Sequence, residues 1–291
     1  MLAPIVCFGL YALSLLSCQA KNGEPNKLIP VNPLPKELTE NSGLIELEED
    51  VYVGLNDGGN SPNLYLFSLK RKIGTRTIKI NNATNVDWED LTTDSLYVYI
   101  GDMGNNDGNR KDLTIYRVKK DDLRSKAVAD AEKITYTYST QTNFNSSSKN
   151  NFDCEALVCV GDSLYLFSKN RGNKKTDVYS LPKTPGNYIA KHITQFEANG
   201  LITSAAYRTV AGRNDLVLIG YDNKGKSYNG FMIYFPMVSG TQFFKATAKR
   251  IDFNTSLQIE SVMFRPNNQV YISNEEKGSQ EGLIYKADLP L

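Results

Sequence analysis

A fivefold repeat of short β-type segments is the feature that most constrains this chain. Each copy starts with a small or acidic residue and an apolar pair, followed by an apolar strand with polar residues at its end and a third strand containing an aromatic residue. The second strands of the copies are residues 51–57, 96–102, 164–169, 216–221 and 270–274. Repeats of roughly 50 residues are typical of propellers. We therefore predict an all-β fold, a five-bladed β-propeller.

The two ends of the repeat array predict how the ring closes. The fifth copy stops after three strands, whereas residues 27–33 precede the first copy and have no partner there. We expect this N-terminal segment to pair with the last blade, because closure removes exposed sheet edges. The predicted domain spans 27–291, a size that single all-β domains reach. An irregular β-sandwich is the alternative fold.

The N-terminus is typical of an export signal. Residues 1–16 are apolar but too short to span a bilayer, and they lead into Leu-Leu-Ser-Cys at 15–18. This stretch resembles a bacterial lipoprotein cleavage box, which implies a signal peptide at 1–17, acylation of Cys18 and a tether over 18–26. The expected location is the bacterial cell envelope, as an outer-membrane lipoprotein facing either side and touching the membrane through its lipid. No Lys or Arg precedes the apolar run, so cleavage elsewhere with an incidental cysteine is the alternative.

Charge and composition exclude several kinds of chemistry. The net charge is +1, so nothing in it favours nucleic acid as a partner. His192 is the one histidine, which argues against histidine-rich metal sites. Cys154 and Cys159 lie in one expected strand on opposite faces, so we predict two free thiols.

The first residues of the five copies are the candidate hub residues. The first strand of each blade lines the axis of a propeller, so Ser42, Glu89, Glu155, Ser204 and Glu260 should converge at one mouth of the channel. Three carboxylates crowded in this way repel one another unless they are protonated or share a cation. Oxygen ligands of this kind suit Ca²⁺. The alternative is that each Glu caps backbone amides at the mouth.

A family resemblance rests on the order Ser, Glu, Glu, Ser, Glu at the starts 42–44, 89–91, 155–157, 204–205 and 260–262. It resembles the soluble calcium-activated nucleotidase (apyrase) family. The resemblance implies a five-bladed propeller with one Ca²⁺ held by these five residues. The chain departs from that family in lacking a full set of basic phosphate contacts. Stretches such as 87–90 and 101–106 are more similar to uncharacterised exported bacterial propeller proteins.

Polar residues at the ends of the second strands should surround the hub, because antiparallel neighbours bring these ends to the same face. Carboxylates that could position water are Asp57, Asp102 and Glu275. Candidate ligand-binding residues are Lys169, Arg171, Asn105, Asn106, Tyr221 and Asn274. Ordinary turn chemistry is the alternative for each of them.

Two functions follow from this pattern. The first is a propeller with Ca²⁺ at its hub that binds a small phosphorylated molecule, a glycan or a partner protein. The second is a Ca²⁺-dependent phosphoester or phosphoanhydride hydrolase, with Lys169 and Arg171 on the phosphate. Fold alone does not choose between them.

Overall fold

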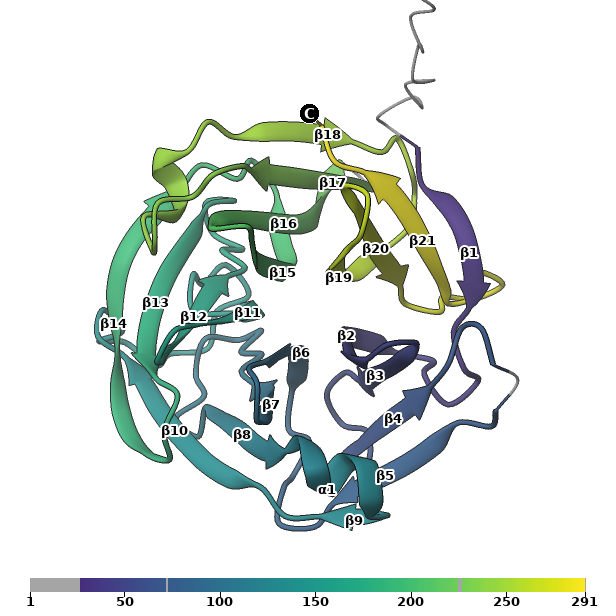
Figure 1. The fold of residues 1–291 in the computed structure, drawn as a ribbon. Helices are drawn as coiled ribbons and strands as arrows, with labels where there is room; N and C mark the ends of the chain where they lie inside the picture. The colour runs from purple at the N-terminus through teal and green to yellow at the C-terminus, as the bar shows by residue number, and fades with distance from the viewer. Residues whose placement is uncertain (1–26, 72, 225–226, 291) are drawn as a thin grey trace, which may run out of the picture.

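The strands of this protein are arranged around a central axis in a propeller-type fold (Figure 1). The computed structural model describes residues 27–71, 73–224 and 227–290. The signal peptide, Cys18 and the tether expected over 1–26 lie outside the described residues. Helix within the described ranges amounts to α1 (Lys120–Ser125) and the 3-10 turn η1 (Phe243–Lys245). No helix there is both long and apolar enough to cross a membrane.

Hydrogen bonds join the strands into four sheets. The first contains β2 (Asn41–Glu48), β3 (Val51–Asn56), β4 (Asn63–Phe67), β5 (Arg76–Ile80) and β9 (Val128–Ala129). The third contains β15 (Leu201–Val210), β16 (Arg213–Lys224), β17 (Ser227–Phe235) and β18 (Lys249–Asp252). The last contains β19 (Ile259–Arg265), β20 (Gln269–Asn274), β21 (Leu283–Asp288) and β1 (Ile29–Pro33).

The second sheet has eight strands and departs from the expected five separate sheets. One half contains β6 (Trp88–Thr93), β7 (Tyr97–Asp102), β8 (Thr114–Lys119) and β10 (Glu132–Tyr138). The other half contains β11 (Cys154–Val160), β12 (Ser163–Ser168), β13 (Thr176–Pro182) and β14 (Gly186–Phe196). Only the second part of β14 pairs with β13, so its first part is free to pair in parallel with β10 and fuse the halves.

The first strands of the sequence repeat lie innermost. β2, β6, β11, β15 and β19 each contact the next, and β19 returns to β2 (Figure 1). Side chains alternate between the two faces of a strand, so each sheet buries an apolar face against its neighbour. Trp88 shows the result: it is fully buried in a cluster that unites the first sheet with β6–β8, and its indole N–H donates to the Thr84 carbonyl at 3.0 Å.

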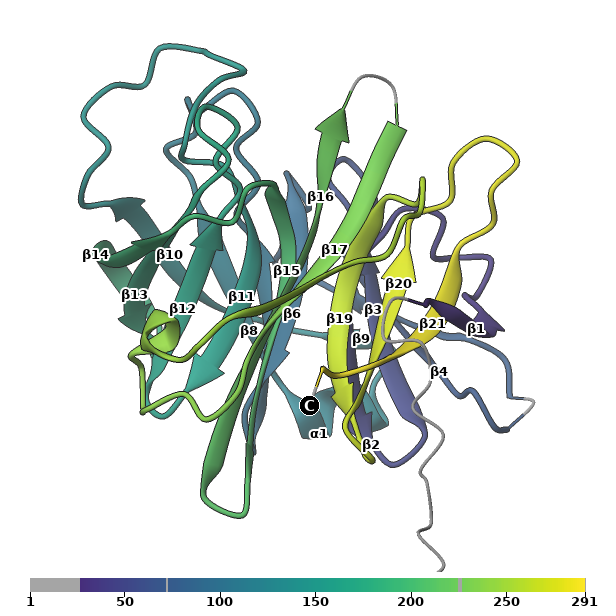
Figure 2. The same cartoon turned by 90° about the horizontal axis from the view of Figure 1, so that it is seen from above.

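The N-terminal strand completes the last sheet. β1 pairs antiparallel with β21, where Ile29 faces Lys286 and Pro33 faces Leu283. Figure 2 shows the ring from the side, with the β15–β16 and β19–β20 turns at the end opposite the β16–β17 hairpin. Cys154 and Cys159 are both free, Cys154 buried and Cys159 half-buried.

Removal of β1 should destabilise the ring, because it exposes the edge of β21. We expect a chain starting at residue 34 to lose about 2 to 4 kcal/mol of unfolding free energy, at about 1 kcal/mol per backbone hydrogen bond. Urea unfolding measures the loss, with a chain starting at residue 27 as the control. Equal midpoints for the two chains would show that β1 does not close the ring.

Candidate functional site

Each inner strand carries a β-bulge near its first residue, where the pairing with the second strand skips one position. The skipped residues are Ser42, Glu89, Glu155, Thr203 and Glu260. A bulge re-aims the side chain of its extra residue, and bulges are common next to functional sites. Four of the five residues predicted from the sequence repeat therefore occupy equivalent positions around the axis.

The fourth repeat shifts by one residue, so Thr203 and not Ser204 occupies its bulge. The Ser204 hydroxyl lies 3.3 Å from both carboxylate oxygens of Asp90 and accepts the Val262 N–H at 3.3 Å. Asp90 also accepts the Leu157 N–H at 3.0 Å. Ser204 therefore belongs to a buried network that links β6, β11, β15 and β19, one residue further along the strand than the bulges.

Two groups of carboxylates meet at the bulges and share one residue. Carboxylate oxygens of Asp57, Asp87 and Glu89 lie within 4.8 Å of one another, and so do those of Glu89, Asp153 and Glu155. Sequence reasoning missed Asp87 and Asp153 as site residues. The signal was present, since each Asp stands two residues before the acidic start of a repeat, directly before the inner strand begins.

Lys169 and Arg171 neutralise the second of these groups. Lys169 is buried, forms an ion pair with Glu155 and lies 5.0 Å from the centre of the Tyr221 ring. Arg171 Nε lies 2.6 Å from Asp153 Oδ2, its Nη2 lies 3.5 Å from Glu155, and it also donates to Asn106. Both cations predicted to bind a ligand are therefore engaged within the protein.

The first group, Asp57, Asp87 and Glu89, has weaker internal partners. The Ser42 hydroxyl donates to Glu89 Oε2 at 3.4 Å, and Asn106 Nδ2 donates to Asp87 Oδ2 at 3.4 Å. Asp57 accepts the N–H of the next residue, Gly58. No salt bridge to any of these three carboxylates is found among the described residues.

Two glycines allow the loops to approach this group closely. A Cβ at Gly104 would lie 2.2 Å from Glu89 Oε1 and 2.4 Å from the Asp87 carboxylate. A Cβ at Gly58 would lie 2.3 Å from Asp87 Oδ1. The carboxylates are thus enclosed by backbone that only glycine permits.

Burial and mutual repulsion disfavour ionisation of these carboxylates. Burial, with the nearby charges of Asp57 and Asp153, raises the pKa of Asp87 to about 7. Burial and the charge of Glu155 hold the pKa of Glu89 well above its usual range. Burial also raises the pKa of Glu260 to about 7. At neutral pH a cation beside Asp87 and Glu89 would favour the ionised forms of these two residues.

Several residues predicted to surround the hub instead form hydrogen bonds or ion pairs within the loops. Asp102 pairs with Arg110 at 2.9 Å and accepts the Asp87 N–H, and it belongs to neither group of carboxylates. Asn105 accepts the Arg110 N–H at 3.0 Å and donates to Phe152 O. Asn274 donates to the carbonyls of Glu275 and Glu281.

Glu275 and Tyr221 stay close to the hub. Burial and the charge of Asp57 raise the pKa of Glu275. Tyr221 contacts Lys169 and stacks edge-on against Tyr228, with ring centres 4.8 Å apart. These residues, with exposed Asn106 and partly exposed Arg171, form the polar rim around the carboxylates.

Comparison with known proteins supports the fold class. No family model and no curated relative matches the chain. Among solved structures, the PQQ-bound aldose sugar dehydrogenase from Streptomyces coelicolor aligns at a TM-score of 0.52 and 8% identity, over 90% of this chain and 98% of that one. A glucose dehydrogenase aligns at 0.51 and 10% identity, over 91% and 100%. At this identity the likeness establishes the propeller-type fold, and it lends no support to the nucleotidase resemblance.

The raised pKa values predict an unusual pH dependence for the metal-free protein. A carboxyl group whose folded-state pKa exceeds its unfolded value stabilises the folded state below the unfolded pKa, and this contribution is lost as pH rises through the folded pKa. The unfolded values are near 3.8 for Asp87 and 4.5 for Glu260, and both folded values are about 7. Stability in chelator should therefore fall between about pH 4.5 and about pH 8.

Midpoints of urea unfolding, measured in chelator across this pH range, test the predicted loss of stability. Asp87→Asn should flatten the decline, because it removes one of the titrating groups. Glu49→Gln is the matched control, since the Glu49 side chain is 93% exposed. A midpoint that rises with pH over this range in the native sequence would contradict the prediction.

Proposed function

We propose that this protein is an exported, lipid-anchored propeller of five blades that holds Ca²⁺ at the mouth of its hub and binds a ligand on the surrounding polar rim. The proposed blade count follows the five inner strands, with the eight-stranded sheet taken as two blades fused through β10 and β14. The carboxylates of Asp57, Asp87 and Glu89 carry the proposal, since their oxygens lie within 4.8 Å of one another and no ion pair to them occurs in the described part of the chain.

The donor set suits Ca²⁺ better than zinc. The three carboxylates, with the Ser42 hydroxyl beside Glu89, are hard oxygen ligands, and Ca²⁺ accepts six to eight such oxygens with waters completing the shell. Zinc sites favour His and Cys, which this group does not contain. In this proposal Glu155 is the counter-ion of Lys169, and buried Glu260 lies near this pair. Ser204 hydrogen-bonds the neighbouring inner strands.

The engaged cations favour binding over hydrolysis. A phosphate ligand would have to compete with Glu155 for Lys169 and with Asp153 for Arg171. A glycan or a protein partner needs no free cation, because hydroxyl and carbonyl oxygens can complete the Ca²⁺ shell. We therefore place a glycan or a protein ahead of a phosphorylated small molecule as the ligand.

The location is part of the proposal. Cleavage before Cys18 and acylation would place the propeller in the bacterial cell envelope as an outer-membrane lipoprotein. The N-terminal strand β1 begins at Ile29, shortly after the proposed tether, and lies at the outer edge of its sheet, where a tether can leave without crossing the rim (Figure 1).

Ca²⁺ should raise the thermal stability of the protein. A ligand at a hundredfold excess over its Kd stabilises by about 2.7 kcal/mol, which corresponds to roughly 5 to 10 °C in Tm for a domain of this size. Differential scanning calorimetry in Ca²⁺ and in chelator measures the shift. Glu89→Gln and Gly104→Ala should each abolish it, whereas Glu49→Gln should leave it intact. The same Tm in both conditions would rule out the metal.

Hydrolysis is the second candidate function, because carboxylates beside a metal can position water and Arg171 remains 26% exposed at the rim. A panel of nucleotides and sugar phosphates, assayed with Ca²⁺ and with chelator, tests it. We expect no Ca²⁺-dependent phosphate release. Turnover that Glu89→Gln abolishes would instead establish the hydrolase and displace the binding proposal.

A further inference from the structure

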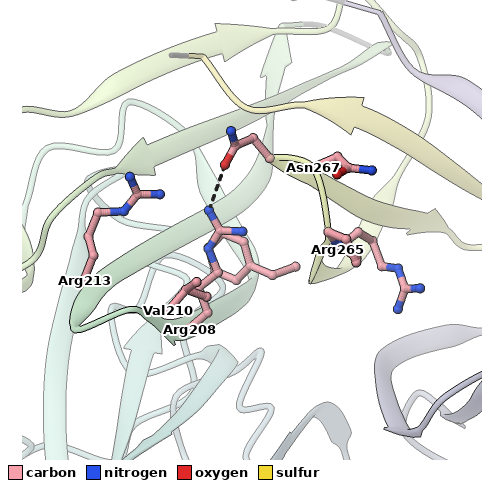
Figure 3. Close-up of a pocket in the computed structure, with 8 residues that line it drawn as sticks. Arg208, Val210, Arg213, Arg265 and Asn267 are labelled. Atoms are coloured by element: carbon pink, nitrogen blue, oxygen red, sulfur yellow. Dashed lines mark hydrogen bonds between the residues drawn. The ribbon is translucent and has the colours of Figure 1, made fainter.

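A cavity of about 560 Å³ lies at the far ends of β15 and β19, away from the bulges. Three arginines line it, Arg208, Arg213 and Arg265, together with the apolar residues Val210, Phe264 and Pro266. Figure 3 shows Arg208 and Arg213 on one side, and Arg265 with Asn267 on the other. The cavity is therefore separate from the carboxylates at the hub.

Two of the arginines share one buried carboxylate. Arg208 donates to Asp215 Oδ2 from Nε at 3.0 Å and from Nη2 at 2.8 Å, and Arg213 Nη2 lies 3.3 Å from the same oxygen. The Asp215 side chain is fully buried. Burial alone would raise the pKa of Asp215, but the Arg208 hydrogen bonds and the Met237 N–H outweigh it and lower the pKa. Two guanidinium groups and one carboxylate leave a charge of +1.

The third arginine adds no net charge. Arg265 forms an ion pair with Glu46, and its guanidinium lies 4.9 Å from the centre of the Tyr271 ring. The charged groups of the cavity, Asp215 and Glu46 included, therefore sum to +1. This balance matches a ligand with one negative charge better than a phosphate monoester, whose charge approaches two at neutral pH.

The Arg213 guanidinium has N–H groups that can donate hydrogen bonds to a ligand. Its side chain is 46% exposed, and within the described ranges its only hydrogen bond comes from Nη2. Arg208, by contrast, is held in place, with its guanidinium 4.4 Å from the centre of the Phe264 ring and Nη2 3.5 Å from Asn268 Oδ1. A planar guanidinium with free N–H groups matches a carboxylate in two parallel hydrogen bonds.

The rest of the cavity wall is apolar. Val210 is 53% exposed, and Phe264 and Pro266 lie beside the arginines. A ligand that fills the cavity thus meets hydrocarbon next to its charge. We propose that this cavity binds a small organic carboxylate with a single negative charge, which Arg213 holds while the apolar part contacts Val210 and Phe264.

Isothermal titration calorimetry with benzoate tests the proposal, with benzamide as an uncharged molecule of the same shape. Chelator in the buffer keeps the test independent of the hub. Native protein should bind benzoate and not benzamide. Arg213→Gln should weaken benzoate binding at least about tenfold, in line with the loss of a charged hydrogen bond. Val210→Asp should do the same, because a carboxylate directly opposite Arg213 repels benzoate and competes with it for the guanidinium.

Arg71→Gln is the matched control, because Arg71 is also about half exposed and pairs at 3.3 Å with a buried carboxylate, Asp50, elsewhere in the fold. It should leave benzoate binding unchanged. Circular dichroism verifies that the variants fold. Absence of benzoate binding, equal binding of benzamide, or binding that survives both pocket variants would overturn the proposal. Tighter binding of inorganic phosphate than of benzoate would overturn the assignment to carboxylates.

Discussion

One extra residue in each inner strand organises the hub of this protein. In a strand without a bulge the side chains alternate strictly between the two faces. The residues packed in the core would then also fix the face on which the first residue of the strand lies. The bulges at Ser42, Glu89, Glu155, Thr203 and Glu260 release that constraint. Side chains at the mouth can then converge while the remainder of each strand keeps its apolar faces against the neighbouring sheets.

The carboxylates that meet at the hub repel one another, and the site reduces this repulsion in two different ways. On one side, Lys169 and Arg171 neutralise Glu155 and Asp153 from within the protein. On the other side, Asp57, Asp87 and Glu89 have no cation of their own among the described side chains, and their charge is kept low by raised pKa values. The first solution is supplied by the chain itself and needs no bound ion. The second depends on pH and on whatever cation is present, which is the property expected of a binding site and not of a structural ion pair.

Sequence reasoning located much of this arrangement, for physical reasons that also explain its errors. The acidic first residues of the repeats, Glu89, Glu155 and Glu260, were predicted to lie at one end of the axis. This was possible because each repeat of the sequence places its first residue at the same point of an inner strand. The repeat predicted Ser204 for this set, whereas the bulge of β15 falls at Thr203, because a bulge has no sequence signature in an apolar strand. Asp102 was expected beside the hub, but its carboxylate pairs with Arg110 from the loop after β7, a contact that the repeat pattern does not reveal. The pairing of β10 with β14 was beyond prediction, because it depends on how much of β14 its neighbour β13 leaves uncovered.

The union of β1 with β21 has a kinetic consequence. These two strands stand near opposite ends of the described chain, and their pairing is the contact of longest sequence separation in the sheets. Contacts of this kind form late, since the entropy of a long loop opposes them until the intervening sheets have assembled. Among the described strands β1 is made before all others and β21 after them, so β1 has no partner in its sheet until β21 is present. An unpaired strand of this kind is a surface on which other chains can add, so the β1–β21 pairing also removes a route to aggregation.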